Sequence, residues 1–374
     1  MDKYNSKTAF QKWISSISID KLSKKSQDTI GIFDSYSKKL DFRTALKILL
    51  YAVYEELPSY REIDRAFMDK RLCKEIGIHS LCYSSLSRKT TEIAPEVLMD
   101  IFNQLVYKVS KMRPSSKTTS LQIIDSTTIS LNKTWFPWAK FRQTKSGIKL
   151  HLNLCYLDEN NQYPEKFTIT NAEEHDRAQV ELLIDKAEAT YVVDRGYFDY
   201  KLLDKLNDDG YFFVTRIKSN TKITVLSQIE TGHVENTDGQ VISDQQVILG
   251  DKGNHITERF RLVTVLTKGK KLLRIVTNRF DASSNEIAAM YQARWHIELF
   301  FKHLKQNLSI KRLYSRNERG ATNQVILTMI ATLLTYLVKV ELRSSSTLFQ
   351  LKRTFHYLMY EPARKWIAYH YSPG

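Results

Sequence analysis

Residues 291–305 read YQARWHIELFFKHLK, and this stretch carries the strongest structural signal in the chain. At about 100° per residue of helix, its polar side chains fall within an arc of about 60°. The residues that share this face are Tyr291, Arg294, Glu298 and Lys305. The other side is apolar and carries Phe300, Phe301, Leu304 and Leu308. The pattern predicts a helix that packs on a core and presents one carboxylate between two cations and a phenol. A solvated amphipathic helix fits the same spacing.

Two aspartates occupy matching positions upstream of this helix. Asp125 follows the apolar run LQII at 121–124, and Asp194 follows YVV at 191–193. A carboxylate at the end of a buried strand is held rigidly at a sheet edge, where ligand sites of α/β folds gather. A single aspartate in that place is more often a cap or a turn former. Two such residues followed by Glu298 favour an acidic site, which we expect to form from two strands and one helix.

The region around the two aspartates has the alternation of a mixed α/β core. Strands are predicted at 121–124, 149–157, 166–170, 191–193 and 211–216, with helices at 180–186 and 200–206. From 217 to 283 helical periodicity disappears, and Thr, Val, Gln and Ile mingle with turn signals at 231–232, 238–239 and 250–254. We therefore expect a β-rich insertion between the second aspartate and the glutamate helix.

Residues 1–114 have the three- and four-residue apolar spacing of helices. The stretch 60–93 fits a helix-turn-helix in which Arg88 and Lys89 contact DNA, and a helical packing domain with a basic surface fits it equally well. A Ser-, Lys- and Pro-rich linker is expected at 111–119. Lys149 lies on a predicted strand, where a DNA contact and a structural role are both open.

The net charge of +15, from 56 basic and 41 acidic residues, favours a polyanionic partner such as nucleic acid. A membrane is not expected as the partner, because the most apolar stretch, 325–338, is too short to span a bilayer and is interpreted as a buried helix. Cys73, Cys82 and Cys155 have no metal-binding or disulfide spacing and are expected to be reduced thiols of a cytosolic protein.

These residues resemble a known family. The pattern Y-x2-R-x3-E-x6-K is similar to the Tyr-Arg-Glu-Lys signature of bacterial insertion-sequence transposases of the IS-four group. The segments IDST at 124–127, VDRGY at 193–197 and GIKLH at 147–151 resemble the stretches around that family's first and second aspartates. The resemblance covers roughly residues 120–315, in order.

The resemblance implies an RNase H-like mixed sheet with helical regions before and after it. We assign 1–114 to an N-terminal DNA-binding domain, 115–216 and 284–320 to the catalytic core, 217–283 to the insertion and 321–374 to a C-terminal helical region. The family resemblance also implies cut-and-paste transposition, in which the terminal inverted repeats are paired and joined to target DNA. The protein is then expected to act as a homodimer in the cytoplasm, associated with the nucleoid.

Phosphodiester chemistry explains the residue types. Three carboxylates, Asp125, Asp194 and Glu298, suit two Mg²⁺ ions, with Mn²⁺ as a substitute, because these cations prefer oxygen ligands. Arg294, Lys305 and Tyr291 would grip the terminal phosphates. Two rivals remain at this stage: a nuclease on the same core that does not transpose, and an inactive derivative that only binds DNA.

Overall fold

A computed structural model describes residues 7–112, 120–142, 145–174, 176–197, 199–229, 239–251, 254–255, 258–308, 310 and 312–371. Residues 113–119 of the linker expected at 111–119 and the turn at 231–232 lie outside these residues, while Lys111 and Met112 belong to the last turn of a helix and not to a linker. The helices before the sheet are α1 Ala9–Ile14, α2 Lys24–Ser35, α3 Phe42–Tyr54, α4 Tyr60–Ala66, α5 Lys70–Ile76, α6 Tyr83–Glu92 and α7 Pro95–Met112, with a 3₁₀ turn η2 at Ile19–Lys21.

The strands of the core are β1 Leu121–Leu131, β2 Lys140–Arg142, β3 Lys145–Asp158, β4 Asn161–Asn171, β5 Thr190–Val193 and β6 Phe212–Arg216. They enclose α8 Asp176–Leu183, the 3₁₀ turn η3 Arg195–Tyr197 and α9 Tyr200–Asp208. The insertion contributes β7 Ile223–Gln228, β8 Gly239–Asp251, β9 Asn254–His255, β10 Phe260–Thr267 and β11 Leu272–Thr277. The chain continues through α10 Ser284–Ala293, α11 Trp295–Asn307, α12 Glu318–Glu341, α13 Leu348–Leu358 and α14 Ala363–His370.

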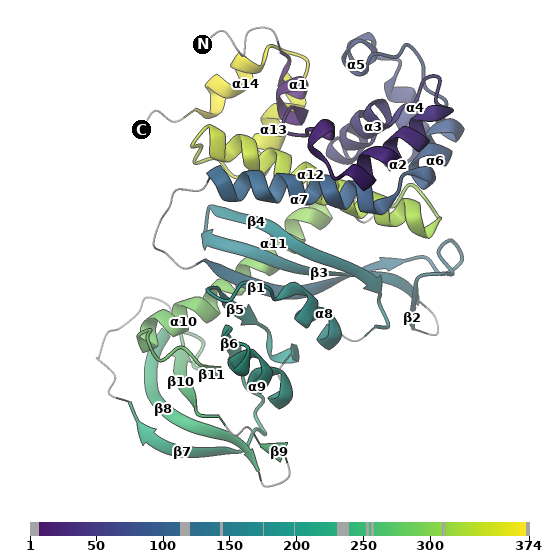
Figure 1. The fold of residues 1–374 in the computed structure, drawn as a ribbon. Coiled ribbons are helices and arrows are strands. Elements are labelled where there is room, and N and C mark those ends of the chain that lie inside the picture. Colours follow the sequence, from purple (N-terminus) through teal and green to yellow (C-terminus); the bar gives the residue numbers. More distant parts are fainter. Residues whose placement is uncertain are drawn as a thin grey trace.

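The sheet runs in the order β2-β3-β1-β5-β6-β11-β10-β8-β7, with β4 paired to β3. β1, β5 and β6 are parallel to one another, while β1 pairs with β3, and β6 with β11, in antiparallel fashion. The predicted mixed α/β core with a β-rich insertion is therefore confirmed. The insertion extends the same sheet from β6, so that it curves away below the helical layer in Figure 1.

Two cores cover opposite faces of the sheet, and the alternation of strand residues decides which core each side chain joins. Ile123 and Val192 pack with the large cluster that includes side chains of α7, α10, α11 and α12. Their neighbours Ile124 and Val193 pack instead with α8 and α9. Figure 1 shows α7 and α12 lying together along β4 on the helical side.

The helices at the two ends of the chain share one core. α12 is buried along most of its length and packs against α1, α3, α6 and α7, as well as against α13. Near the chain ends, Trp13 of α1 lies 5.3 Å from Phe355 of α13, measured between ring centroids. The helices of the N-terminal region 1–114 thus pack together with the C-terminal helices.

α12 is long and apolar enough to cross a membrane, but 94% of its most apolar window is buried inside the protein. This burial confirms the prediction of a core helix at 325–338. Its Thr residues do not disturb the core, because the hydroxyls of Thr328, Thr332 and Thr335 each donate to the carbonyl four residues earlier.

Candidate active site

Asp125 and Asp194 lie side by side where two parallel strands separate. The pairing of β1 with β5 ends at Ile124 and Val193, one residue before each aspartate. β5 stops there, whereas β1 continues to Leu131 through its pairing with β3. The sequence placed a strand end at both aspartates, and the structure places it only at Asp194, because β3 supplies Asp125 with a partner strand that the local sequence does not reveal.

Strand alternation directs both carboxylates toward the same helices. Asp125 stands two residues after Ile123, and Asp194 two residues after Val192, and both of these apolar residues belong to the core shared with α10 and α11. The backbone amide of Ser126 donates to Asp125 Oδ1 at 2.7 Å, and that of Gly196 donates to Asp194 Oδ2 at 3.3 Å. The two acids therefore face the predicted glutamate helix across a short gap.

The predicted glutamate helix consists of two helices, α10 and α11, that meet at Arg294. Arg294 keeps helical dihedral angles, with φ −52° and ψ −31°. The hydrogen bonds around it are those of a tighter turn: its amide donates to the Tyr291 carbonyl at 3.2 Å, and the Ile297 amide donates to its carbonyl at 3.3 Å. The direction of the chain is kept, so Glu298 still projects from the first turn of α11.

Arg294 joins the three carboxylates. Its guanidinium Nη2 donates to Glu298 Oε1 at 2.6 Å, Nη1 lies 3.8 Å from Asp125 Oδ2, and Nε lies 3.7 Å from Asp194 Oδ1. Side chains that are 69 and 104 residues apart in the sequence thus surround one cation. Three carboxylates therefore share a single guanidinium. Burial makes this arrangement unfavourable, because the charged side chains lose their hydration.

The pKa values of this cluster reflect burial and mutual charge. Burial raises the pKa of Asp125 to about 6, and the charges of Asp194 and Glu298 add to this effect. The Ser126 amide and Arg294 act in the opposite direction. Burial alone would lower the pKa of Arg294, but its hydrogen bond to Glu298 and the charge of Asp194 hold it above the ordinary value. The site therefore favours an additional positive charge.

Tyr291 and Lys305 border the carboxylates as the helical face predicts. Tyr291 is buried, and burial together with the charge of Asp194 raises its pKa, while the charge of Arg294 acts in the opposite direction. Lys305 Nζ donates to Thr127 Oγ1 at 2.5 Å, so α11 is fixed on β1 two residues beyond Asp125.

Arg216 is a neighbour of the site that the sequence reasoning missed. It ends β6, whose residue Thr215 pairs with Val193, so Arg216 follows β6 as Asp194 follows β5. Its positive charge lowers the pKa of Tyr291. The signal was present in the sequence, because Arg216 also follows an apolar run, but only the parallel pairing of the strands places it beside Asp194.

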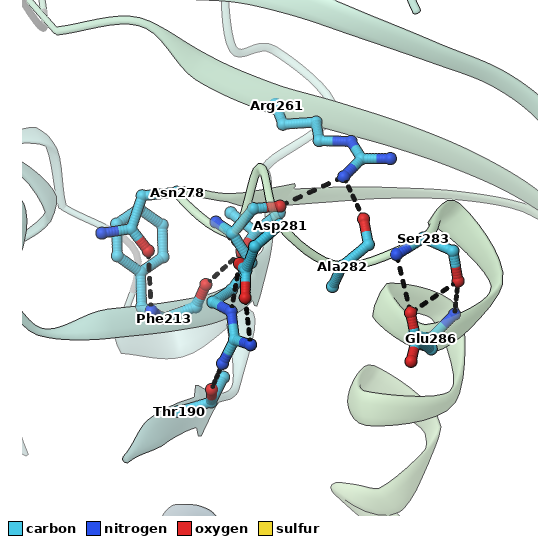
Figure 2. Close-up of polar contacts among 10 residues, drawn as sticks. Thr190, Phe213, Arg261, Asn278, Asp281, Ala282, Ser283 and Glu286 are labelled. Carbon is cyan, nitrogen blue, oxygen red and sulfur yellow. Dashed lines mark hydrogen bonds and ion pairs between the residues drawn. The ribbon is translucent and has the colours of Figure 1, made fainter. Parts of the chain in front are cut away.

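The start of α10 is fixed by a polar network that ties the insertion to the core (Figure 2). Arg261 of β10 forms a buried ion pair with Asp244 of β8 and donates to the Ala282 carbonyl just before α10. Arg279 donates to Thr190 Oγ1 on β5 at 2.5 Å and pairs with Asp281 at 2.7 Å.

A capping box begins the helix itself. The Glu286 amide donates to Ser283 Oγ at 3.3 Å, and the Ser283 amide donates to Glu286 Oε2 at 2.7 Å. Together with the Arg261 and Arg279 contacts, this cap anchors α10 to both the insertion and the core strand β5, so α10 and the glutamate helix α11 that follows are held at a defined angle over the two aspartates.

The structure does not bring the other predicted DNA contacts to this site. Lys149 pairs with Thr128, which alternates with Asp125 and Thr127, so its side chain leaves the opposite face of the sheet. Lys89 is buried: it donates to the Phe33 carbonyl at 3.1 Å and lies 3.1 Å from Glu92. Packing against α2 therefore replaces the predicted DNA contact of Lys89. Arg88 is exposed, far along the chain from the carboxylates, and lies 3.7 Å from Glu92.

The donor set of the cluster suits a divalent metal. All three acidic side chains offer carboxylate oxygens, which are the ligands that Mg²⁺ and similar cations prefer. Within the described part of the chain, no three acidic, His or Cys residues are spaced as metal ligands. In this arrangement the carboxylates surround the Arg294 guanidinium, so a metal ion and Arg294 compete for the same oxygens.

Comparison with known proteins identifies relatives of the whole arrangement. Residues 116–334, more than half of the chain, match the family model of the transposase DDE domain. This range includes Asp125, Asp194 and Glu298, as well as the insertion between the last two.

Three curated proteins are similar over most of their length. The probable transposase for insertion sequence element IS5377 of Geobacillus stearothermophilus is 28% identical over 309 residues, which cover 82% of this chain and 78% of the relative. The putative transposase y4zB of Sinorhizobium fredii is 30% identical over 63% of this chain and 65% of its own. The putative transposase for insertion sequence element IS4SA of Synechocystis is 27% identical over 70% and 74%.

Proposed function

The chain belongs to the transposase DDE family, as an insertion-sequence transposase of the IS-four type, and on this basis we propose that Asp125, Asp194 and Glu298 are its catalytic carboxylates. The observation that supports this assignment is the convergence of the three acids on Arg294 from two strands and a helix. As a transposase the enzyme acts on DNA, cleaving it and transferring a strand.

Divalent metal is a general requirement of this family. We assign two Mg²⁺ ions, replaceable by Mn²⁺, to the three carboxylates. Bound there, they would polarise the scissile phosphate and activate the attacking oxygen. Asp125 is suited to hold both ions because the charges of Asp194 and Glu298 both act on it and its burial leaves its charge poorly hydrated.

The cations and the phenol have separate roles in this proposal. Arg294 exchanges part of its carboxylate contacts for a phosphate of the bound end, which its planar guanidinium holds in bidentate fashion. Tyr291, on the same helical face as Arg294, donates its phenol hydroxyl to a terminal phosphate. Lys305, on the same helical face, donates to Thr127, two residues beyond Asp125 on β1, and from there neutralises a second phosphate.

The proposed reaction is cut-and-paste transposition by a homodimer at the nucleoid. An insertion sequence has two terminal inverted repeats, and the described residues of one chain contain a single cluster of these three carboxylates. Two chains would therefore bring two such clusters to the paired ends, which are then joined to target DNA.

A labelled duplex that carries a terminal repeat and its flanking sequence tests the assignment. In Mg²⁺ we expect strand cleavage and joining by the unaltered protein. Asp125→Asn, Asp194→Asn and Glu298→Gln should abolish both steps and keep binding in a gel shift. The matched control Asp208→Asn, at an exposed position of α9, should react as the unaltered protein does.

The two rival functions predict other outcomes. Cleavage without joining, under conditions where target DNA is present, would indicate a nuclease that does not transpose. Binding without any cleavage by the unaltered protein would indicate an inactive derivative. Full activity in any of the three acid variants would remove that residue from the catalytic set.

A further inference from the structure

Thr127 lies on the same side of β1 as Asp125 and contacts the helix that carries Glu298. Side chains alternate along a strand, so Asp125 and Thr127, two residues apart, point to the same face of the sheet. Their partners in the pairing of β1 with β3 are Leu152 and Leu150, and both leucines are buried in the core that includes α11. Thr127 therefore faces α11, about 7 Å along the strand from Asp125.

The group on α11 that Thr127 contacts is the ammonium of Lys305. Lys305 Nζ donates to Thr127 Oγ1 at 2.5 Å. Lys305 belongs to the last turn of α11, seven residues after Glu298, so the two side chains share one face of the helix and are about 10 Å apart along its axis. A residue of the strand that carries the first aspartate thus holds a cation of the helix that carries the glutamate.

The chemical nature of the Thr127 side chain decides what this contact does to the charge of Lys305. Glu298 accepts from Arg294 at 2.6 Å with a carboxylate, which cancels part of the charge of the guanidinium. Thr127 accepts from Lys305 with a neutral hydroxyl, which orients the ammonium without cancelling its charge. An ammonium has three N–H donors, and directing one of them to a fixed acceptor also sets the directions of the other two.

Thr127 is rigid where Lys305 is flexible. The ammonium of a lysine ends a four-carbon stem whose bonds each have several rotamers. Thr127 is branched at Cβ, which restricts χ1, and it lies in a strand that is hydrogen-bonded to β3. A hydroxyl on the strand therefore limits the positions of the charge on the flexible stem. A charge that is oriented before its ligand arrives loses less conformational entropy when a phosphate binds.

We propose that Thr127 is a positioning residue for strand cleavage, which holds the Lys305 ammonium in the orientation that binds a phosphate of the DNA end. The proposal rests on the proposed function and adds to it a residue that acts through Lys305. One strand then fixes both partners of the reaction, because β1 carries the metal-binding Asp125 and, through Thr127, the phosphate-binding cation. The backbone of β1 sets the spacing between metal and phosphate.

Cleavage of a labelled terminal repeat in Mg²⁺ by matched variants tests this role. Thr127→Val removes the hydroxyl and keeps the β-branched shape that suits a strand. It should slow cleavage about 10-fold, because one hydrogen bond to a charged group is lost, and should change affinity in a gel shift less than about 2-fold. Thr127→Ser keeps the hydroxyl and should recover most of the rate. The control is Thr128→Val, the same substitution on the opposite face of β1, which should cleave as the unaltered protein does.

Two further measurements separate positioning from a merely structural effect. In a protein that already carries Lys305→Met, Thr127→Val should cause little additional loss of rate, because no ammonium remains for the hydroxyl to hold. The Mg²⁺ concentration that gives half the maximal rate should be the same for Thr127→Val and the unaltered protein, because Asp125 stays in place. Thermal melting with a chelator present checks that each variant folds. Thr127→Ala, which places no methyl group beside the ammonium, should show the same loss as Thr127→Val.

Three results would overturn the role of Thr127. One is cleavage by Thr127→Val and Thr127→Ala at the rate of the unaltered protein. Another is a loss that Thr127→Ser does not recover or that persists in full beside Lys305→Met, since either would show that the hydroxyl does not act through the ammonium. The third is a raised Mg²⁺ requirement of Thr127→Val, which would make displacement of Asp125 the cause. Failure of the unaltered protein to cleave any end would instead refute the proposed function.

Discussion

The burial of Asp125 predicts that Asp125→Asn stabilises the metal-free protein while abolishing its chemistry. The pKa of Asp125 is raised from 3.8 to about 6, mainly because its side chain is buried and only 21% exposed. At about 1.36 kcal/mol per pKa unit, the ionised carboxylate costs the folded state about 3 kcal/mol. An amide avoids this cost and still accepts the Ser126 amide hydrogen bond.

The pH dependence of unfolding gives this prediction its sign. A carboxylate with a raised folded-state pKa binds its proton more tightly in the folded protein, so its unfavourable contribution is complete above pH 6 and disappears as the pH falls through 6 toward 3.8. Asp125→Asn should therefore exceed the unaltered protein by about 1–3 kcal/mol at pH 8, where part of the gain is offset by the partner that Arg294 loses. The two should converge near pH 4.

Urea unfolding at several pH values, with a chelator present, measures the difference. Asp208→Asn serves as the control, because this exposed change should give the same small difference at every pH. A variant Asp125→Asn that is less stable than the unaltered protein at pH 8 would refute the reasoning. A difference that stays constant between pH 8 and pH 5 would show that desolvation of this carboxylate is not its source.

Three other predictions concern the site, its supporting network and its charge. Arg294→Gln and Lys305→Gln should each slow strand cleavage about 10- to 100-fold, because each removes one charge-assisted phosphate contact of about 1.5–3 kcal/mol. Their affinity in a gel shift should change far less. Equal losses in both assays would make these residues general DNA-binding charges. Arg261→Met should destabilise the fold by about 3–5 kcal/mol in thermal or urea unfolding, because Asp244 would remain buried without its partner. A second substitution, Asp244→Leu, should recover much of this lost stability. Binding to any DNA should weaken steeply between 50 and 200 mM salt in a fluorescence titration, because basic side chains of this chain, whose net charge is +15, displace counterions from the phosphates.

Much of the fold could be predicted because the relevant signals are local. The alternation around 121–216 predicted the mixed core, and the loss of helical periodicity after 217 predicted the β-rich insertion. The family was confirmed by its match over residues 116–334. The spacing of the helical face also led to the residues that the structure gathers around Arg294, although their catalytic roles remain a prediction.

Positions that depend on strand pairing and long-range packing could not be predicted in this way. Lys149 and Asp125 are both strand residues, but the register of β3 against β1 turns Lys149 to the other face of the sheet. Lys89 has the sequence context of an exposed cation, and its burial follows from the packing of α2 against α6 through Phe33. Arg216 becomes a neighbour of Asp194 only through the pairing of β6 with β5.

By itself, then, the sequence determined the elements, the family and the candidate acids, because helix periodicity, strand alternation and short motifs are encoded within about fifteen residues of each other. Only the tertiary structure decided that Arg294 lies among all three carboxylates, and that Arg316 lies beside the ring of Trp135. The physical reason is that a change of one residue in strand register moves a side chain to the opposite face, and the register is set by contacts between distant parts of the chain.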